Sequence, residues 1–249
     1  MRFEASISSV PELIDSLVTR AEFSSEVWFR GLRRSTHQLL PSIARPNNRV
    51  SGEMMLMKRF QQNAVPFLPH NPATEWDWLF LMQHYGAPTR LLDWSESPLV
   101  ALYFSVHPQV EPDDEDGALW CMWPQELNSL SGISPDLSTD VPCFAVDPVL
   151  DTYLPSTMAR EHTTRLLPVA AIARRQFPRM SAQLGTFTIT HRDQHALESV
   201  ASGNHVAKFT IPRSAKPLIR EQLYRLRYTE LTLFPELTSV ARLTNGLVI

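Results

Sequence analysis

The chain has 249 residues, of which 43% are hydrophobic and 9% aromatic, so it can bury a large core. Its 23 basic and 26 acidic residues leave a formal net charge of -3, which excludes a whole-molecule positive field for holding a polyanion. Cys121 and Cys143 are the two cysteines, which excludes a disulfide scaffold and a cysteine-rich zinc site.

The compartment and the number of domains follow from the same features. Residues 1–20 carry acids and hydroxyls where a signal peptide needs an apolar core, and no run of about 18 apolar residues occurs. We therefore expect a cytoplasmic protein without a membrane partner, built as a single domain over residues 1–249.

The N-terminal third of the chain predicts three helices and a strand. Ser9 followed by Pro11 is typical of a capped amphipathic helix, and residues 26–31 (EVWFRG) indicate a strand closed by Gly31. A second helix is predicted from Gly52 to Asn63. A third runs from a Thr74 cap to Gly86, which places His84 and Tyr85 in its last turn.

The next segment has the densest chemistry in the chain. Residues 89–95 (TRLLDWS) indicate a buried strand, and residues 97–106 a helix with Ser97 as its cap and Pro98 at its first position. The strand would thus deliver Asp93, Trp94 and Ser95 to a strand-to-helix corner. Polar residues inside an apolar pattern usually mark a functional site.

The remaining elements complete the predicted fold. An acidic turn at 108–117 comes first, followed by a strand at 117–123 and an irregular surface excursion at 128–155. After it we expect a helix at 168–174, strands at 184–190 and 205–211, a helix at 214–227 and a final helix starting at Pro235. This order predicts an α+β fold with a central mixed, largely antiparallel sheet flanked by helices.

Arg30 is unusual because it follows two aromatic residues in the predicted strand. A buried guanidinium without partners costs several kcal/mol, and its rigid fork of donors suits a phosphate or a carboxylate. A ligand and an internal ion pair with Asp93 or Glu230 are both consistent with the sequence. Arg33, Arg34, Arg45 and Arg49 follow, so residues 30–49 form either a polyanion contact or a solvated basic face.

Other residues support several kinds of site and exclude others. His84 and Tyr85, just before Arg90 and Asp93 in the sequence, are candidates for acid–base chemistry or for orienting a ligand. A lone histidine is more often structural, which is the alternative for His84. The eight histidines are scattered without HExxH spacing, so we expect no metal. The GxSxG, GxxxxGK[ST] and GxGxxG patterns are also missing.

Four segments together resemble the FRG domain family: WFRG at 28–31, QHYGAPTRLLDWSESPLVALYFS at 83–105, RMSAQLGTF at 179–187 and LFPEL at 233–237. The similarity extends over about residues 20–242. The family is named for the triplet that stands here as Phe29, Arg30 and Gly31.

The chain is also similar, more distantly, to ADP-ribosyltransferases of the arginine–serine–glutamate type. Arg30-Gly31, Trp94-Ser95 and Gln183 occur in the order of that family's motifs, although Gln183 stands where its glutamate is expected. This resemblance implies an ADP-ribosyltransferase-like fold with NAD as substrate.

Residue roles follow from the same resemblance. Arg30, Asp93, Ser95 and Gln183 would be catalytic. The cofactor-binding residues would be Arg30, Gly31, His84, Tyr85, Arg90 and Trp94. An amide at Gln183 cannot deprotonate an acceptor or offset a full positive charge, which leaves Asp93 as the carboxylate of the site.

Two functions are therefore expected. The first is an NAD-dependent ADP-ribosyltransferase-like enzyme that modifies a protein or nucleic-acid acceptor. The family resemblance suggests that such an enzyme is a bacterial toxin or phage-defence effector, controlled by an antitoxin or regulator. The alternative is a non-catalytic module that binds a nucleotide, nucleic acid or protein and has a degenerate active site.

Overall fold

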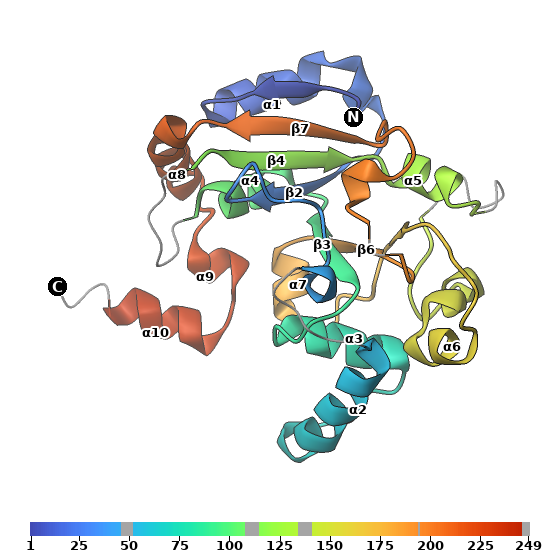
Figure 1. Cartoon of the computed structure of the whole chain (residues 1–249). Coiled ribbons are helices and arrows are strands. Elements are labelled where there is room, and N and C mark those ends of the chain that lie inside the picture. Colours follow the sequence, from blue (N-terminus) through green and yellow to red (C-terminus); the bar gives the residue numbers. More distant parts are fainter. Residues whose placement is uncertain (46–51, 108–114, 134–140, 194, 246–249) are drawn as a thin grey trace.

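The computed structural model describes residues 1–45, 52–107, 115–133, 141–193 and 195–245 (Figure 1). Across these residues seven strands form one sheet in the order β1-β7-β4-β2-β3-β6-β5. The strands are β1 (Glu4–Ser6), β2 (Trp28–Leu32), β3 (Leu91–Ser95), β4 (Gly117–Met122), β5 (Val169–Ala171), β6 (Gly185–Ile189) and β7 (Val206–Ile211). β1 and β7 are parallel and the other neighbours antiparallel, so the predicted mixed, largely antiparallel sheet of an α+β fold is confirmed.

Helices surround this sheet. The α-helices are α1 (Val10–Thr19), α2 (Glu53–Ala64), α3 (Glu75–His84), α4 (Pro98–Val106), α5 (Pro124–Leu130), α6 (Pro155–Arg160), α7 (Pro178–Ala182), α8 (Lys216–Arg225), α9 (Glu230–Leu233) and α10 (Leu237–Asn245). Shorter 3-10 helices are η1 (Ala21–Ser24), η2 (Ser42–Ala44), η3 (Val65–Phe67), η5 (Pro148–Tyr153), η6 (Leu197–Ser199) and η7 (Arg213–Ala215). Within the described ranges, no helix is both long and apolar enough to cross a bilayer.

The predicted caps explain where three of these helices begin. The side chains of Ser9, Thr74 and Ser97 accept hydrogen bonds from the first turns of α1, α3 and α4. Such a bond satisfies one of the backbone N–H groups that a helix start leaves without an intrahelical partner. The start of α4 directly after β3 therefore fixes the predicted strand-to-helix corner.

Three predictions about secondary structure were wrong. The helix expected at 168–174 is strand β5, because Ala170 pairs with Thr188 of β6 and exchanges hydrogen bonds of 2.8 and 3.0 Å with the amide of Asn128. Strand β1 was not predicted, so EVWFRG supplies the second strand. The last helix begins at Leu237 rather than at Pro235.

The excursion expected at 128–155 is more ordered than predicted. α5 extends into it as far as Leu130, and η5 occupies 148–153. Residues 134–140 of this excursion and residues 108–114 of the acidic turn lie outside the described residues, as does Arg49.

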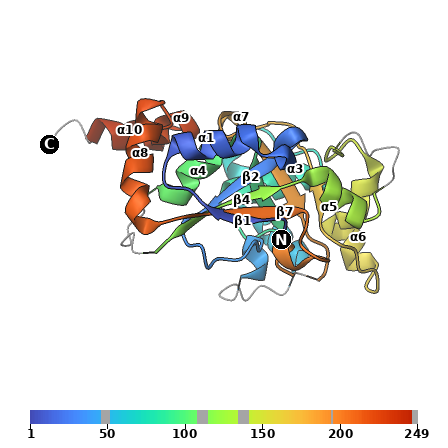
Figure 2. The same cartoon turned by 90° about the horizontal axis from the view of Figure 1, so that it is seen from above.

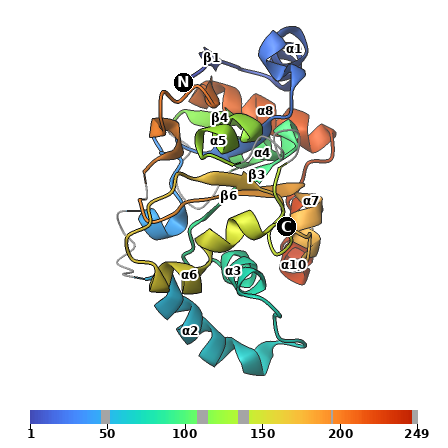
Figure 3. The ribbon, with the colours of Figure 1, turned by 90° about the vertical axis from the view of Figure 1, so that its right-hand side faces the viewer.

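The described core has one cluster toward each end of the sheet and a third, with Trp28, Trp94 and Trp120, that spans the β2–β3 junction. Near β2, β4 and β7, apolar side chains of α1, α4 and α8 pack together with those of the strands. Near β3, β5 and β6 the covering helices include α2 and α3, which lie at the opposite end of the molecule from α1 (Figures 1 and 3). Figure 2 shows α8 and α10 at one side of the sheet and α5 and α6 at the other. The two halves meet between β2 and β3.

Candidate functional site

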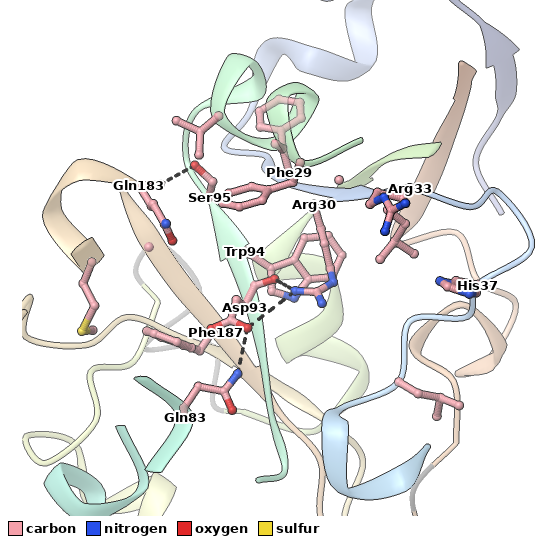
Figure 4. Close-up of a pocket in the computed structure, with 18 of the residues that line it drawn as sticks. Phe29, Arg30, Arg33, His37, Gln83, Asp93, Trp94, Ser95, Gln183 and Phe187 are labelled. Carbon is pink, nitrogen blue, oxygen red and sulfur yellow. Dashed lines mark hydrogen bonds and ion pairs between the residues drawn. The ribbon is translucent and has the colours of Figure 1, made fainter. Parts of the chain in front are cut away.

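A pocket of about 1020 Å³ lies at the junction of β2 and β3 (Figure 4). β2 pairs with β4 from Trp28 to Leu32, and β3 pairs with β6 from Leu91 to Ser95. Within the described residues, β2 and β3 pair with each other at Phe29–Ser95 alone. The sheet therefore opens beyond this pair. The volume of the pocket is at the upper end of the range for pockets that hold small molecules and cofactors.

Arg30 bridges this opening. Its Nη1 donates a hydrogen bond to the backbone carbonyl of Asp93. Arg90 and Glu96, each three positions from Asp93, form backbone hydrogen bonds on the β6 side of the strand. Successive residues of an antiparallel strand bond to opposite sides, so the carbonyl of Asp93 points toward β2. The guanidinium thus occupies a position that a backbone N–H would take in a continuous sheet.

The charge state of Arg30 depends on its surroundings. The side chain is 15% exposed, and its Nη1 lies 3.8 Å from Oδ2 of Asp93. Burial lowers the pKa of Arg30 to about 10, while Asp93 opposes this shift and Arg45 adds to it. Arg30 consequently remains a cation at neutral pH. Its buried Nε has no hydrogen-bond partner among the described residues, so these residues leave part of its donor capacity unused.

Gly31 is explained by packing. A Cβ atom at this position would lie 1.9 Å from the carbonyl oxygen of Ala101 and 2.7 Å from the backbone nitrogen of Ser105. Real Cβ atoms do not come so close to backbone, so only glycine lets α4 lie this tightly against β2. In the Phe29-Arg30-Gly31 triplet, Phe29 therefore enters the core, Arg30 the pocket, and Gly31 admits a helix.

Asp93 presents a carboxylate to the pocket. Its side chain is 54% exposed, and Oδ2 accepts a 2.7 Å hydrogen bond from Nε2 of Gln83. Gln83 is oriented in turn by the hydroxyl of Thr89, which donates to Gln83 Oε1 over 2.5 Å. These contacts leave Oδ1 without a hydrogen bond among the described residues. Sequence reasoning missed Gln83, since a neutral amide on a helix gives no signal until its partner in the fold is known.

Ser95 and Gln183 meet at the α7 end of the pocket, as Figure 4 shows. The Ser95 hydroxyl donates to the backbone carbonyl of Gln183 over 2.6 Å and accepts from the backbone N–H of Ser97 over 3.0 Å. Nε2 of Gln183 donates to the carbonyl of Leu233 over 3.0 Å. Both side chains therefore hold backbone segments in place, and neither supplies a charge.

His84 and Arg179 line the same end of the pocket. The His84 ring stacks on Phe177 with a centroid distance of 4.6 Å, and the Arg179 guanidinium lies 4.5 Å above the ring of Phe234. Burial and the charge of Arg179 lower the pKa of His84, against an opposing effect of Glu236. His84 is thus a neutral imidazole near pH 7.

A basic shelf forms another wall. We use this name for the pocket-lining residues Arg33, Arg34, Thr36, His37, Gln38 and Arg45. Arg34 forms an ion pair of 3.2 Å with Glu115, and burial together with the neighbouring arginines lowers the pKa of His37. With Arg30 and Arg179, five arginines line the pocket, against the single carboxylate of Asp93 in the described lining. The pocket therefore favours an anionic ligand.

Two expected site residues do not line the pocket. Arg90 is 2% exposed, forms a 2.7 Å ion pair with Glu53 of α2, and donates to the carbonyls of Tyr153 and Thr190. These partners bury its donors away from the pocket. The side chain of Tyr85 is 68% exposed at the end of α3. Trp94 does reach the lining, and its indole N–H donates to the Thr188 hydroxyl over 3.1 Å.

Together these features define an α+β chain with an arginine-rich pocket at an opening in its sheet. The FRG domain family model matches residues 25–114, so this part of the chain is similar to FRG domains. The match contains Arg30, Gln83, Asp93 and Ser95, and it is shorter than the expected range of 20–242, since RMSAQLGTF and LFPEL lie beyond it. No curated protein and no solved structure matches the chain.

Proposed function

We propose that the pocket binds NAD and that the chain is an ADP-ribosyltransferase-like enzyme. The observation that carries this proposal is the placement of one exposed carboxylate, Asp93, among five arginines and several aromatic rings in a pocket of about 1020 Å³. Arginine forks suit a pyrophosphate, and aromatic faces suit the flat cationic nicotinamide ring. Arg30 and Arg179 are the proposed phosphate contacts.

In the proposed reaction, the bond between the nicotinamide nitrogen and ribose C1′ breaks, and its electron pair leaves with nicotinamide. Asp93 stabilises the positive charge that develops on the ribose. A nucleophilic atom of the acceptor then bonds to C1′ and releases its proton to solvent. Oδ1 of Asp93, which has no partner among the described residues, is the atom available to face the ribose.

The direct test is NAD turnover by the wild-type chain and by Asp93→Asn. The asparagine is isosteric and keeps one oxygen toward Gln83, so NAD affinity should change little, whereas nicotinamide release should fall at least about 100-fold. Isothermal titration with NAD and chromatographic detection of nicotinamide measure the two quantities. Equal turnover in both proteins would remove Asp93 from the mechanism.

The second candidate is a binding module without catalysis. Gln183 favours it, because this amide stands where the transferase pattern has a glutamate and its Nε2 is already bonded to the Leu233 carbonyl. A module of this kind would bind NAD tightly and release no nicotinamide, even in the presence of cell lysate. The same titration and chromatography therefore separate the two candidates.

A further inference from the structure

The pocket has positive charge on both sides of Asp93. Arg179, a residue of α7, lies near His84, whereas the basic shelf lies near Arg30 on the other side. Figure 4 shows Arg33 and His37 across Arg30 from Gln183. One dinucleotide has a single pyrophosphate, for which Arg30 and Arg179 are the proposed contacts. The shelf is therefore available for a second anionic group.

The shelf offers donors for phosphate oxygens. Thr36, His37, Gln38 and Arg45 are exposed, and their side chains are hydroxyl, imidazole, amide and guanidinium groups. Such groups form the larger part of protein contacts to the nucleic-acid backbone. Of the described residues, Glu115 is an acid that pairs with Arg34, one negative charge beside the three arginines of the shelf.

A nucleic acid fits this shelf better than a protein. Protein interfaces depend on buried aromatic and aliphatic anchors, and the exposed residues of the shelf include none. The shelf also has no Phe, Tyr or Trp ring on which a base could stack. Its contacts would therefore be with the phosphate backbone of the nucleic acid and would not depend on the nucleotide sequence. Since the whole chain has a net charge of -3, this attraction must be local.

We propose that the basic shelf holds the phosphodiester backbone of a nucleic-acid acceptor and thereby brings a nucleophile of that strand to the ribose beside Asp93. This inference rests on the proposed function, because it assigns the acceptor of the same reaction. It concerns binding as well as turnover, so the two can be tested separately.

The test is fluorescence anisotropy with labelled 20-nucleotide mixed-sequence single strands of DNA and RNA, over a series of KCl concentrations. Replacing Arg34 and Arg45 together by alanine should lower the slope of log affinity against log salt by about 2, since each phosphate contact contributes about 1. Arg59→Ala is the matched control, because Arg59 is an exposed arginine of α2 away from the shelf. Its slope should match the wild type.

NAD kinetics of the same proteins separate the two proposals. The double variant should change the KM for NAD less than Arg179→Ala does, while it weakens oligonucleotide binding more. An unchanged salt slope in the double variant, or the reverse pattern between the two proteins, would overturn the shelf proposal. A wild-type chain that binds the oligonucleotide through the shelf but releases no nicotinamide would refute the proposed reaction and leave the shelf assignment standing.

Discussion

Arg30 donates a hydrogen bond to the backbone carbonyl of Asp93 while its Nη1 lies 3.8 Å from the carboxylate of the same residue. One arginine thus bridges two strands and contacts the carboxylate of the pocket. The sequence left a ligand contact and an internal ion pair open for Arg30. The structure contains the ion pair with Asp93, and in the part of the chain that it describes the Nε atom of Arg30 has no hydrogen-bond partner.

Arg30→Ala should therefore affect both stability and ligand binding. The free energy of unfolding should fall by about 2 kcal/mol, because the Asp93 carbonyl loses a charge-assisted hydrogen bond. NAD binding should be lost in the folded protein. Urea denaturation and titration calorimetry measure the two effects, and a variant with full affinity for NAD would show that Arg30 is purely structural.

Gln83 is expected to position Asp93. In Gln83→Leu the carboxylate loses its 2.7 Å donor and can rotate, so kcat should fall roughly 10- to 100-fold with a smaller change in KM. Thr89→Val removes only the hydroxyl that orients Gln83, and its effect should have the same direction and a smaller size. Steady-state NAD kinetics check both variants. A change confined to thermal stability would contradict the positioning role.

Gly31→Ala should strongly destabilise the chain. The new methyl group would meet the Ala101 carbonyl, so β2 and α4 would have to separate, at a cost of about 3 kcal/mol. Gly185→Ala is the matched control, because a Cβ there would lie 3.5 Å from its nearest neighbour, the carbonyl of Met180. That substitution should change the free energy of unfolding, measured by denaturant titration, by no more than about 0.5 kcal/mol. Similar losses in both variants would contradict the packing explanation.

Local features of the fold were predictable, whereas its long-range partners were not. Ser9, Thr74 and Ser97 cap their helices as expected, because capping involves residues three positions apart. β5 was taken for a helix, since Val169–Ala171 become a strand only through pairing with β6. Such pairing does not appear in a short apolar segment by itself.

The candidate site shows the same division. The sequence singled out Arg30, Asp93, Ser95 and Gln183, and all four line one pocket. Arg90 lies outside this pocket, and its partner Glu53, 37 positions away in the sequence, is reached only in the folded chain. The same holds for the contact between α4 and Gly31. Buried ion pairs and close helix approaches depend on the tertiary fold, which one sequence does not encode in any local pattern.

Glu53→Ala tests the structural role of Arg90. Removing the carboxylate leaves a buried guanidinium without its counter-ion, so the free energy of unfolding should fall by about 3–5 kcal/mol. Neither residue lines the pocket, so NAD affinity of the folded fraction should be retained at low temperature. A selective loss of NAD binding with normal stability would instead return Arg90 to the site.

Acidification should lower the stability of the chain. Burial lowers the pKa of His191 and His205 below the ordinary value of 6.5, with Arg90 adding to the effect on His191. As the pH falls below about 6.5, the unfolded chain binds more protons than the folded chain, and the free energy of unfolding decreases.

Thermal denaturation between about pH 7.5 and 5 measures this dependence. His205→Gln removes one titrating group and keeps a donor for the Leu197 carbonyl, which lies 3.0 Å from His205 Nε2. Its Tm should depend less steeply on pH than that of the wild type. A wild-type Tm that rises on acidification would show that other groups dominate.

The opening beyond Phe29–Ser95 divides the sheet into two hydrogen-bonded ladders, β1-β7-β4-β2 and β3-β6-β5. Few main-chain bonds join them, so each ladder can exchange its amide hydrogens largely on its own timescale. A ligand that contacts Arg30 on one ladder and Asp93 on the other would tie the two together. Occupancy of the pocket would then be visible as slower exchange on both sides of the opening, including strands that the ligand never touches.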